Sequence, residues 1–168
     1  MEDCRFNRLQ MTAIVLLRVL IGWHFLYEGA AKLLKPNWSA AGYLLQARWI
    51  FADLFKWIAE SPNVLPIVNQ MNMWGLVAIG LGLILGCFTR LAGMAGMALI
   101  LVYYLCNPLF VGYFYSMPME GNYLVVNKNL VEAAALWVIV ITGSGRYIGL
   151  DRILHQLVRR GKSGQKNG

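Results

Sequence analysis

The segment Arg18–Lys32, RVLIGWHFLYEGAAK, lies in an apolar stretch and yet carries four ionisable side chains. A charge in the middle of a bilayer costs at least ~2.5–3.5 kcal/mol, even on insertion scales. On a helix with about 100° of rotation per residue, these side chains share about a third of the circumference. We therefore expect this face to point into a helix bundle or a wet cavity. The four residues are Arg18, His24, Glu28 and Lys32.

The composition around this segment is that of a membrane protein. Of the 168 residues, 58% are hydrophobic and 14% are charged, whereas a soluble domain carries about 25% charged residues. Residues 61–89 and 91–119 contain no charged side chain, and each range exceeds the ~20 residues that a spanning helix needs. The net charge of +7 is not gathered in one patch, which argues against a nucleic-acid partner.

Four apolar stretches predict an all-α integral membrane protein with a four-transmembrane-helix bundle. Gly and Pro residues punctuate the gaps between them. The short turn at Thr89–Arg90 makes the second and third spans an antiparallel hairpin. Residues 1–150 form the single transmembrane domain, and residues 151–168 form a basic cytoplasmic tail. The predicted spans are residues 9–34, 73–88, 91–109 and 124–142.

The distribution of basic residues predicts the orientation. Four spans place both termini on one side, which holds nine basic residues, against five on the other side. Because basic residues are enriched on the cytoplasmic side, both termini are expected in the cytoplasm. The expected location is the inner membrane of a bacterial-type cell, with membrane lipid as the surrounding partner.

Residues 39–60, between the first two spans, have an amphipathic pattern. Their apolar residues fall on one helical face and their polar residues on another. Trp38, Trp49 and Trp57 suit the headgroup region, where an indole keeps its N–H wet. We interpret the segment as an additional amphipathic helix on the outer face of the membrane. A cap packed over the bundle fits the same pattern.

Small residues on the second and third spans favour close helix packing. Gly82 and Gly86 form a GxxxG match, and Ala92 and Gly96 continue the pattern. Such spacing lets helix backbones approach closely. We expect these residues to pack inside the bundle.

The fourth span supplies complementary groups at its start. Lys128 and Glu132 lie one turn apart there. Glu132 is at a depth comparable with the middle of the first span, so we expect Arg18 and Glu132 to form a buried pair. A second expected pair joins Glu28 to Lys32 or to Lys128.

These groups also have a purely structural interpretation. Buried pairs can simply orient helices, and ion pairs are weak evidence for chemistry. His24 can be a packing residue, and Lys32 can extend to the interface. Four ionisable groups on one face, opposite a carboxylate, nevertheless favour a functional site, because such residues are expensive in a membrane.

The sequence contains no redox motif of its own. It has no Cys-x-x-Cys pair, no nucleotide-binding loop and no metal-ligand cluster. His24 in the membrane and His155 in the tail cannot ligate one haem together. No covalently bound cofactor is therefore expected, and a redox cofactor would be lipid-soluble or held by a partner subunit.

Three stretches occur in order along the chain. They are the pattern Arg18-x3-Gly22-x2-Phe25-x3-Gly29-x2-Lys32-Leu33, then GCFTRLAG at 86–93, then GSGRYIGLD at 143–151. Together they resemble the DoxX family of small four-span membrane proteins. The run EGNYLVVNKNLVE at 120–132 is similar to the DoxD-type small subunit of thiosulfate:quinone oxidoreductase.

The resemblance implies a four-helix bundle and a link to the quinone pool. Many members of the family carry an acidic residue near the start of the second span, where this chain has Leu76. If that acidic residue transfers protons in the relatives, this chain has no side chain at the same position that could do so.

The first functional hypothesis is a small subunit of a quinone-linked oxidoreductase, with a polar pocket in the outer half of the bundle. A quinone needs an apolar slot, and proton-exchanging or hydrogen-bonding groups at its carbonyls. The candidate catalytic residues are His24, Glu28 and Glu132. The candidate ligand-binding residues are Arg18, Trp23, Tyr27, Lys32, Lys128 and Asn129. Electrons would come from a protein partner on the outer face.

The second hypothesis is a non-enzymatic scaffold or carrier for an envelope protein or a lipid. In that case the segment 39–60 is a docking surface, and the polar face of the first span holds the helices together. A proton-coupled transporter ranks last, because such folds use inverted repeats or broken helices, and no convincing repeat is present.

Overall fold

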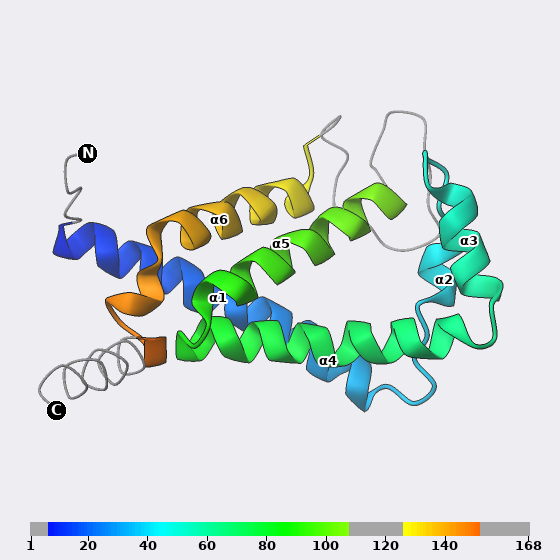
Figure 1. The fold of residues 1–168 in the computed structure, drawn as a ribbon, viewed down its shortest axis with the longest axis horizontal. Helices are drawn as coiled ribbons and strands as arrows, with labels where there is room; N and C mark the ends of the chain where they lie inside the picture. The colour runs from blue at the N-terminus through cyan, green and yellow to red at the C-terminus, as the bar shows by residue number, and fades with distance from the viewer. Residues whose placement is uncertain (1–6, 108–125, 152–168) are drawn as a thin grey trace, which may run out of the picture.

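The structure, a computed structural model, describes residues 7–107 and 126–151 of the chain. Within these ranges the regular elements are helices (Figure 1). They are α1 (Arg8–Leu34), α2 (Ala41–Leu44), α3 (Ala52–Glu60), α4 (Val64–Leu85), α5 (Thr89–Cys106), α6 (Lys128–Thr142) and the short 3-10 helix η1 (Ser144–Arg146).

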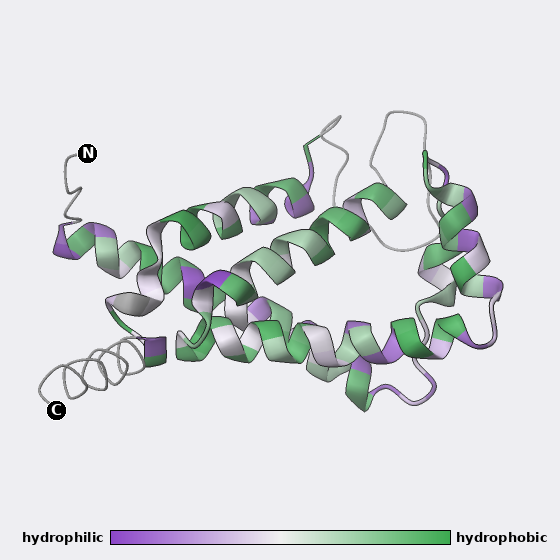
Figure 2. Ribbon diagram, in the orientation of Figure 1, coloured by the Kyte–Doolittle hydropathy of each residue, from purple (hydrophilic) through white to green (hydrophobic). Residues whose placement is uncertain are grey.

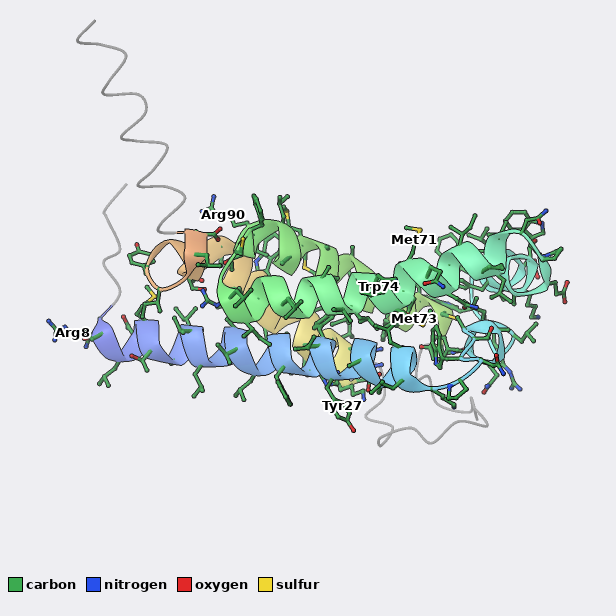
Figure 3. The ribbon with its side chains drawn as sticks, turned by 90° about the horizontal axis from the view of Figure 1, so that it is seen from below. Arg8, Tyr27, Met71, Met73, Trp74 and Arg90 are labelled. Atoms are coloured by element: carbon green, nitrogen blue, oxygen red, sulfur yellow. The ribbon has the colours of Figure 1, made fainter. Side chains whose placement is uncertain are left out.

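The long helices lie side by side along the long axis of the molecule (Figure 1). Helix α1 packs mainly against α4, and α6 packs mainly against α5. The α4–α5 turn, the start of α1 and η1 lie at one end, which we call the hairpin end. Helices α2 and α3 lie at the other, which we call the cap end. In Figure 3 Arg8 and Arg90 both lie towards the hairpin end, on opposite sides of the bundle.

Local sequence signals fix where these helices stop and start. Helix α1 ends just before Pro36, which disfavours helical backbone in the preceding residue. Helices α4 and α6 each end at a glycine in the left-handed conformation, with φ of 65° at Gly86 and 58° at Gly143. Asn127 caps the start of α6, because its side chain accepts a hydrogen bond from the Leu130 amide (3.1 Å).

Three of the described helices, α1, α4 and α5, are long and apolar enough to cross a membrane. Their residues are mostly hydrophobic, with hydrophilic residues in the connections and at some positions within the helices (Figure 2). Helix α6 has 15 residues within the described range. The first predicted span, 9–34, agrees with α1 to within one residue.

The other predicted span boundaries were less accurate. The second span begins at Val64 rather than residue 73 and ends at Leu85 rather than residue 88. The first turns of α4 carry polar side chains that bond to neighbouring segments: Asn69 Oδ1 accepts from the Ala40 amide at 2.9 Å. The third span is α5 rather than 91–109, and residues 108–109 lie outside the described residues.

The fourth predicted span, 124–142, corresponds to α6, and residues 124–125 lie outside the described residues. The predicted basic tail lies there too, apart from Asp151.

The prediction of one continuous helix over 39–60 was wrong. The segment forms α2 and α3, separated by turns at 45–51, and α3 runs across the direction of the long helices (Figure 1). The break allows the two helices to pack on each other. A small second core results, which a single helix could not enclose. Its buried residues are Ala40, Leu44, Ala47, Phe55, Ala59 and Cys106.

Glycines set the close approach of α1 to α4. A Cβ at Gly80 would lie 2.5 Å from the Leu26 amide nitrogen and 2.7 Å from the Gly22 carbonyl oxygen. Such contacts leave no room for a side chain, so the two backbones touch directly. The packing role expected of Gly82 and Ala92 is also confirmed, because a Cβ at Gly82 would lie 3.1 Å from the Ala92 Cβ.

We predict that Gly80→Ala destabilises the protein by about 1–3 kcal/mol, because the added methyl group meets backbone atoms that cannot move aside. Gly75→Ala on the same helix is the matched control, since its Cβ would meet nothing within 4 Å. Thermal unfolding in mild detergent measures both. Equal midpoints for the two variants would contradict the direct α1–α4 contact.

Candidate functional site: a polar cluster towards the cap end

The ionisable face of α1 is divided between two places. Arg18 is 2% exposed and lies near the α4–α5 turn at the hairpin end. His24, Glu28 and Lys32 follow at successive turns towards the cap end. The structure therefore places three of the four groups in one cluster and the fourth in another environment.

His24 and Glu132 form the centre of the cluster and join α1 to α6. The Nε2 atom of His24 lies 3.7 Å from Oε2 of Glu132. The His24 side chain is 46% exposed, whereas that of Glu132 is 16% exposed. Lys128 and Glu28 are further electrostatic neighbours of the Glu132 carboxylate. This distance is longer than a direct hydrogen bond, so a proton would pass between the imidazole and the carboxylate through one water.

Lys32 joins three helices one turn beyond Glu28. Its Nζ lies 3.7 Å from Oε2 of Glu28, which confirms one of the two pairs predicted for Glu28. The same ammonium group donates a hydrogen bond to Oδ1 of Asn72 on α4 (3.3 Å). It also lies over the rings of Trp38 and Tyr103, 5.3 and 5.4 Å from their centroids. Lys32 is thus held on several sides by groups that favour its charge.

The polar network continues into α5 and the α2 region. Nδ2 of Asn72 donates to the Tyr103 hydroxyl (2.5 Å), and the Tyr43 hydroxyl donates to the Tyr103 carbonyl (2.9 Å). Asn107 in turn donates to the Tyr43 carbonyl (3.1 Å). The sequence prediction missed Asn72, Tyr43 and Asn107. An available signal was the group of amide side chains that opens α4, at Asn69, Gln70 and Asn72.

The remaining predicted ligand residues lie at the edge of the cluster or outside it. Trp23 and Tyr27 are 61% and 62% exposed, and Figure 3 shows Tyr27 pointing away from the bundle. Lys128 is exposed, and Asn129 is half-buried in the first turn of α6. The two aromatic rings can therefore flank only a ligand that lies on the outer surface of α1.

The predicted pair of Arg18 with Glu132 was wrong. Glu132 pairs with His24, which is six residues, or about 9 Å of helix rise, from Arg18. Glu132 was expected at a depth comparable with the middle of the first span, but helix α6 packs with Glu132 level with His24. The depth of Glu132 in its span was not precise enough to decide whether Arg18 or His24 is its partner.

Arg18 instead belongs to a second polar group, at the hairpin end. A Cβ at Gly86 would lie 2.9 Å from Nη1 of Arg18, so the guanidinium lies against the C-terminal end of α4. Asp151 is its electrostatic neighbour. Within the described part of the chain, the buried Nε and Nη1 atoms make no hydrogen bond. The partial negative charge of the α4 terminus and the Asp151 carboxylate therefore balance the guanidinium charge.

Asp151 completes this group by capping α5. Its two carboxylate oxygens accept hydrogen bonds from the amides of Phe88 (2.7 Å) and Thr89 (2.9 Å). Its own amide donates to the Gly86 carbonyl (2.9 Å). We call Arg18, Gly86, Thr89 and Asp151 the hairpin clasp. A cation at the end of one helix and an anion at the start of the next are each placed favourably.

Comparison with known proteins places this fold in a family. A DoxX family profile matches residues 13–107, more than half of the chain. The chain belongs to the DoxX family. No curated protein and no solved structure gives a match. DoxX proteins are membrane proteins often tied to oxidoreductase subunits, and with its three apolar helices this DoxX chain is a membrane protein.

The family match and the structure together explain part of the sequence pattern. The matched residues include α1 from its second turn, α4 and α5, and exclude α6 with Glu132. The three stretches that first suggested the family meet in the hairpin clasp, which contains Arg18, Gly86 and Asp151. This meeting gives Arg18 a structural role in the DoxX chain, apart from the cluster around His24.

We predict that Arg18 is coupled energetically to Asp151 and not to Glu132. Arg18→Leu removes the buried cation that lies against the end of α4 and near Asp151, so we expect it to destabilise the fold. In double-mutant cycles, Arg18→Leu and Asp151→Asn should show a coupling of about 0.5–3 kcal/mol. Arg18→Leu and Glu132→Gln should be additive to within about 0.5 kcal/mol. Unfolding midpoints in detergent give both values, and the reverse pattern would contradict the clasp.

Proposed function

We propose that this DoxX protein is a small membrane subunit of a quinone-linked oxidoreductase. The observation that carries the proposal is the His24–Glu132 pair. A half-exposed imidazole beside a carboxylate lies on helices whose other exposed side chains are largely apolar. Ionisable residues in a membrane are expensive, and they mark ligand or proton pathways by default.

The side chains around the pair fit the head group of a quinone. His24 and Glu28 follow one another along α1, and both are 46% exposed. Trp23 and Tyr27 form a parallel aromatic row on the same exposed surface. A quinone has a flat ring and an apolar tail. Its ring can lie against Trp23 and Tyr27 while its carbonyl oxygens accept hydrogen bonds from the row of His24 and Glu28. These side chains lie on the exposed side of α1, so a lipid-soluble ligand would reach them laterally from the membrane.

The residues of the chain would then have separate roles. His24 would hold or release a proton at Nε2, and Glu132 would orient the imidazole and balance its positive charge. Glu28 would exchange protons next to His24. Lys32, which donates a hydrogen bond to Asn72, would provide a positive charge at the cap end of the cluster. Lys128 and Asn129 would contact a ligand from the α6 side. A bound quinone would supply the electron transfer, which no group of the described chain provides.

The sequence and the packing support the proposed setting. Helix α6 would be the fourth span, so that four transmembrane helices enclose the core. The hairpin end would face the cytoplasm of a bacterial-type cell, because basic residues predominate on that side of the chain. The cap end would face outwards, with α3 lying at the membrane surface. The DoxD-like run at 120–132 supports a relation to the small subunit of thiosulfate:quinone oxidoreductase.

The test is direct binding of a quinone to the purified protein in lipid nanodiscs. We expect an affinity of about 1 μM or better, measured by the quinone retained on the protein and by quenching of tryptophan fluorescence. His24→Ala should weaken binding at least about tenfold, the loss expected when a hydrogen-bonding partner is removed. Glu60→Gln, an exposed carboxylate on α3, is the control. No binding at about 100 μM would exclude the proposal.

A second function has its own supporting observation. The α3 region keeps several large apolar side chains exposed, including Phe51, Leu54 and Trp57. Exposed apolar patches mark protein or membrane contacts. This surface suits a scaffold or carrier that binds an envelope protein or a lipid on the outer side.

Co-purification in mild detergent distinguishes the two functions. We expect quinone and an oxidoreductase partner to leave the membrane with the wild-type protein, and both to be reduced by His24→Ala. A scaffold would instead retain its exported partner after His24→Ala and Glu132→Gln, and lose it after Leu54→Asp with Trp57→Asp. Mass spectrometry of the purified complexes identifies the bound lipids and proteins.

A further inference from the structure

The His24–Glu132 pair has different surroundings on its two sides. Towards the cap end, ionisable and hydrogen-bonding side chains continue from one helix turn to the next. Towards the hairpin end, the next turns of both helices carry buried apolar residues. This asymmetry concerns the same pair as the proposed function, but it does not depend on any quinone.

The polar side is continuous from the pair to the end of α1. Glu28 lies one turn beyond His24, and residues four apart on a helix have neighbouring side chains. Lys32 lies 3.7 Å from Glu28, and the Lys32–Asn72–Tyr103 hydrogen bonds carry the row to α4 and α5. Glu28 is also an electrostatic neighbour of both Glu132 and Tyr103.

The apolar side is closed by tight packing. On α6, Leu136 and Ile139 follow Glu132 at the next two turns, and both are 0% exposed. On α1, Ile21 lies one turn before His24 and belongs to the same buried cluster, with Leu83 of α4. The next ionisable residue in this direction is Arg18, about 9 Å away along α1, which belongs to the hairpin clasp.

We infer that the His24–Glu132 pair exchanges protons with the water at the cap end and is sealed from the hairpin end. On acidification, a proton from that water converts the Glu28 carboxylate to a carboxyl group. It then passes to the imidazole of His24, which restores the Glu28 carboxylate. The proton is returned by the same steps in reverse. No electron transfer is required, and charge and atoms balance at each step.

The charged groups that face the pair are consistent with this direction. From α1 the neighbour is Glu28, and from α6 it is Lys128. Helix α4 has no ionisable side chain along its length. Helix α5 contributes Tyr103 at the cap end, while its Arg90 lies at the hairpin end (Figure 3). Within residues 7–107 and 126–151, the titratable neighbours of the pair are therefore on its cap-end side or level with it.

The chain allows a direct test, because it has two histidines, His24 and His155. In a His155→Gln protein, isotope-labelled histidine reports His24 alone. The protein is placed in liposomes of one orientation, selected through a C-terminal tag, without added quinone. One compartment is then acidified from about pH 7.5 to about pH 5.5, across the range in which histidines ordinarily titrate. Solid-state NMR of the imidazole nitrogens reads the protonation state.

The expected result is that the imidazole signal follows the pH of the cap-end compartment and ignores the pH of the other. Glu28→Gln should slow this response at least about tenfold, because the relay loses its carboxylate. Glu60→Gln, outside the row, is the matched control. An imidazole that follows the hairpin-end compartment, or neither compartment, would overturn the inference. Because no quinone is present, a failed quinone-binding test leaves this result intact, and the converse also holds.

Discussion

The structure depends on the requirement that the ionisable side chains of α1 be kept out of hydrocarbon. Each would be costly if it faced acyl chains alone. The fold meets the requirement in two ways. It turns Arg18 against the end of α4 and the Asp151 carboxylate, and it sets His24 beside Glu132 and Lys32 beside Asn72 and Glu28. The relative positions of α1, α4 and α6 follow from these pairings as much as from the apolar core.

The two polar groups have different characters. Three members of the hairpin clasp are buried and Asp151 is half-buried, and the Asp151 carboxylate also caps α5, so the clasp stabilises the α4–α5 turn against α1. The cluster around His24 is partly exposed and unevenly enclosed. Partial exposure of an imidazole and a carboxylate is of little use for stability, because it leaves their charges in apolar surroundings. It is useful for a ligand or a proton that must arrive from outside, and we therefore place the function there.

Much of the fold could be predicted from the sequence, because long apolar stretches and glycine or proline stops report helices directly. The first span was placed to within a residue. The start of α4 was not, since Asn69 and Asn72 look like loop residues until their partners on other segments are known. The face of α1 that carries the site was predicted from helical periodicity. The surroundings of Arg18 were not predicted, because Asp151 lies beyond the fourth span, where the periodicity of the spans gives no guide. Likewise, the pattern of 39–60 predicted neither the break between α2 and α3 nor the exposure of Leu45, Phe51 and Leu54.

The most direct test of this account is the identity of the residue on α1 that faces Glu132. In a protein whose three cysteines are replaced by serine, a cysteine at position 132 can be combined with a second cysteine at position 24 or at position 18. A short bifunctional thiol reagent, applied in native membranes, reports which pair is close. The account predicts efficient cross-linking of 24 with 132 and little of 18 with 132. Cross-linking of 18 with 132 in preference to 24 would contradict it.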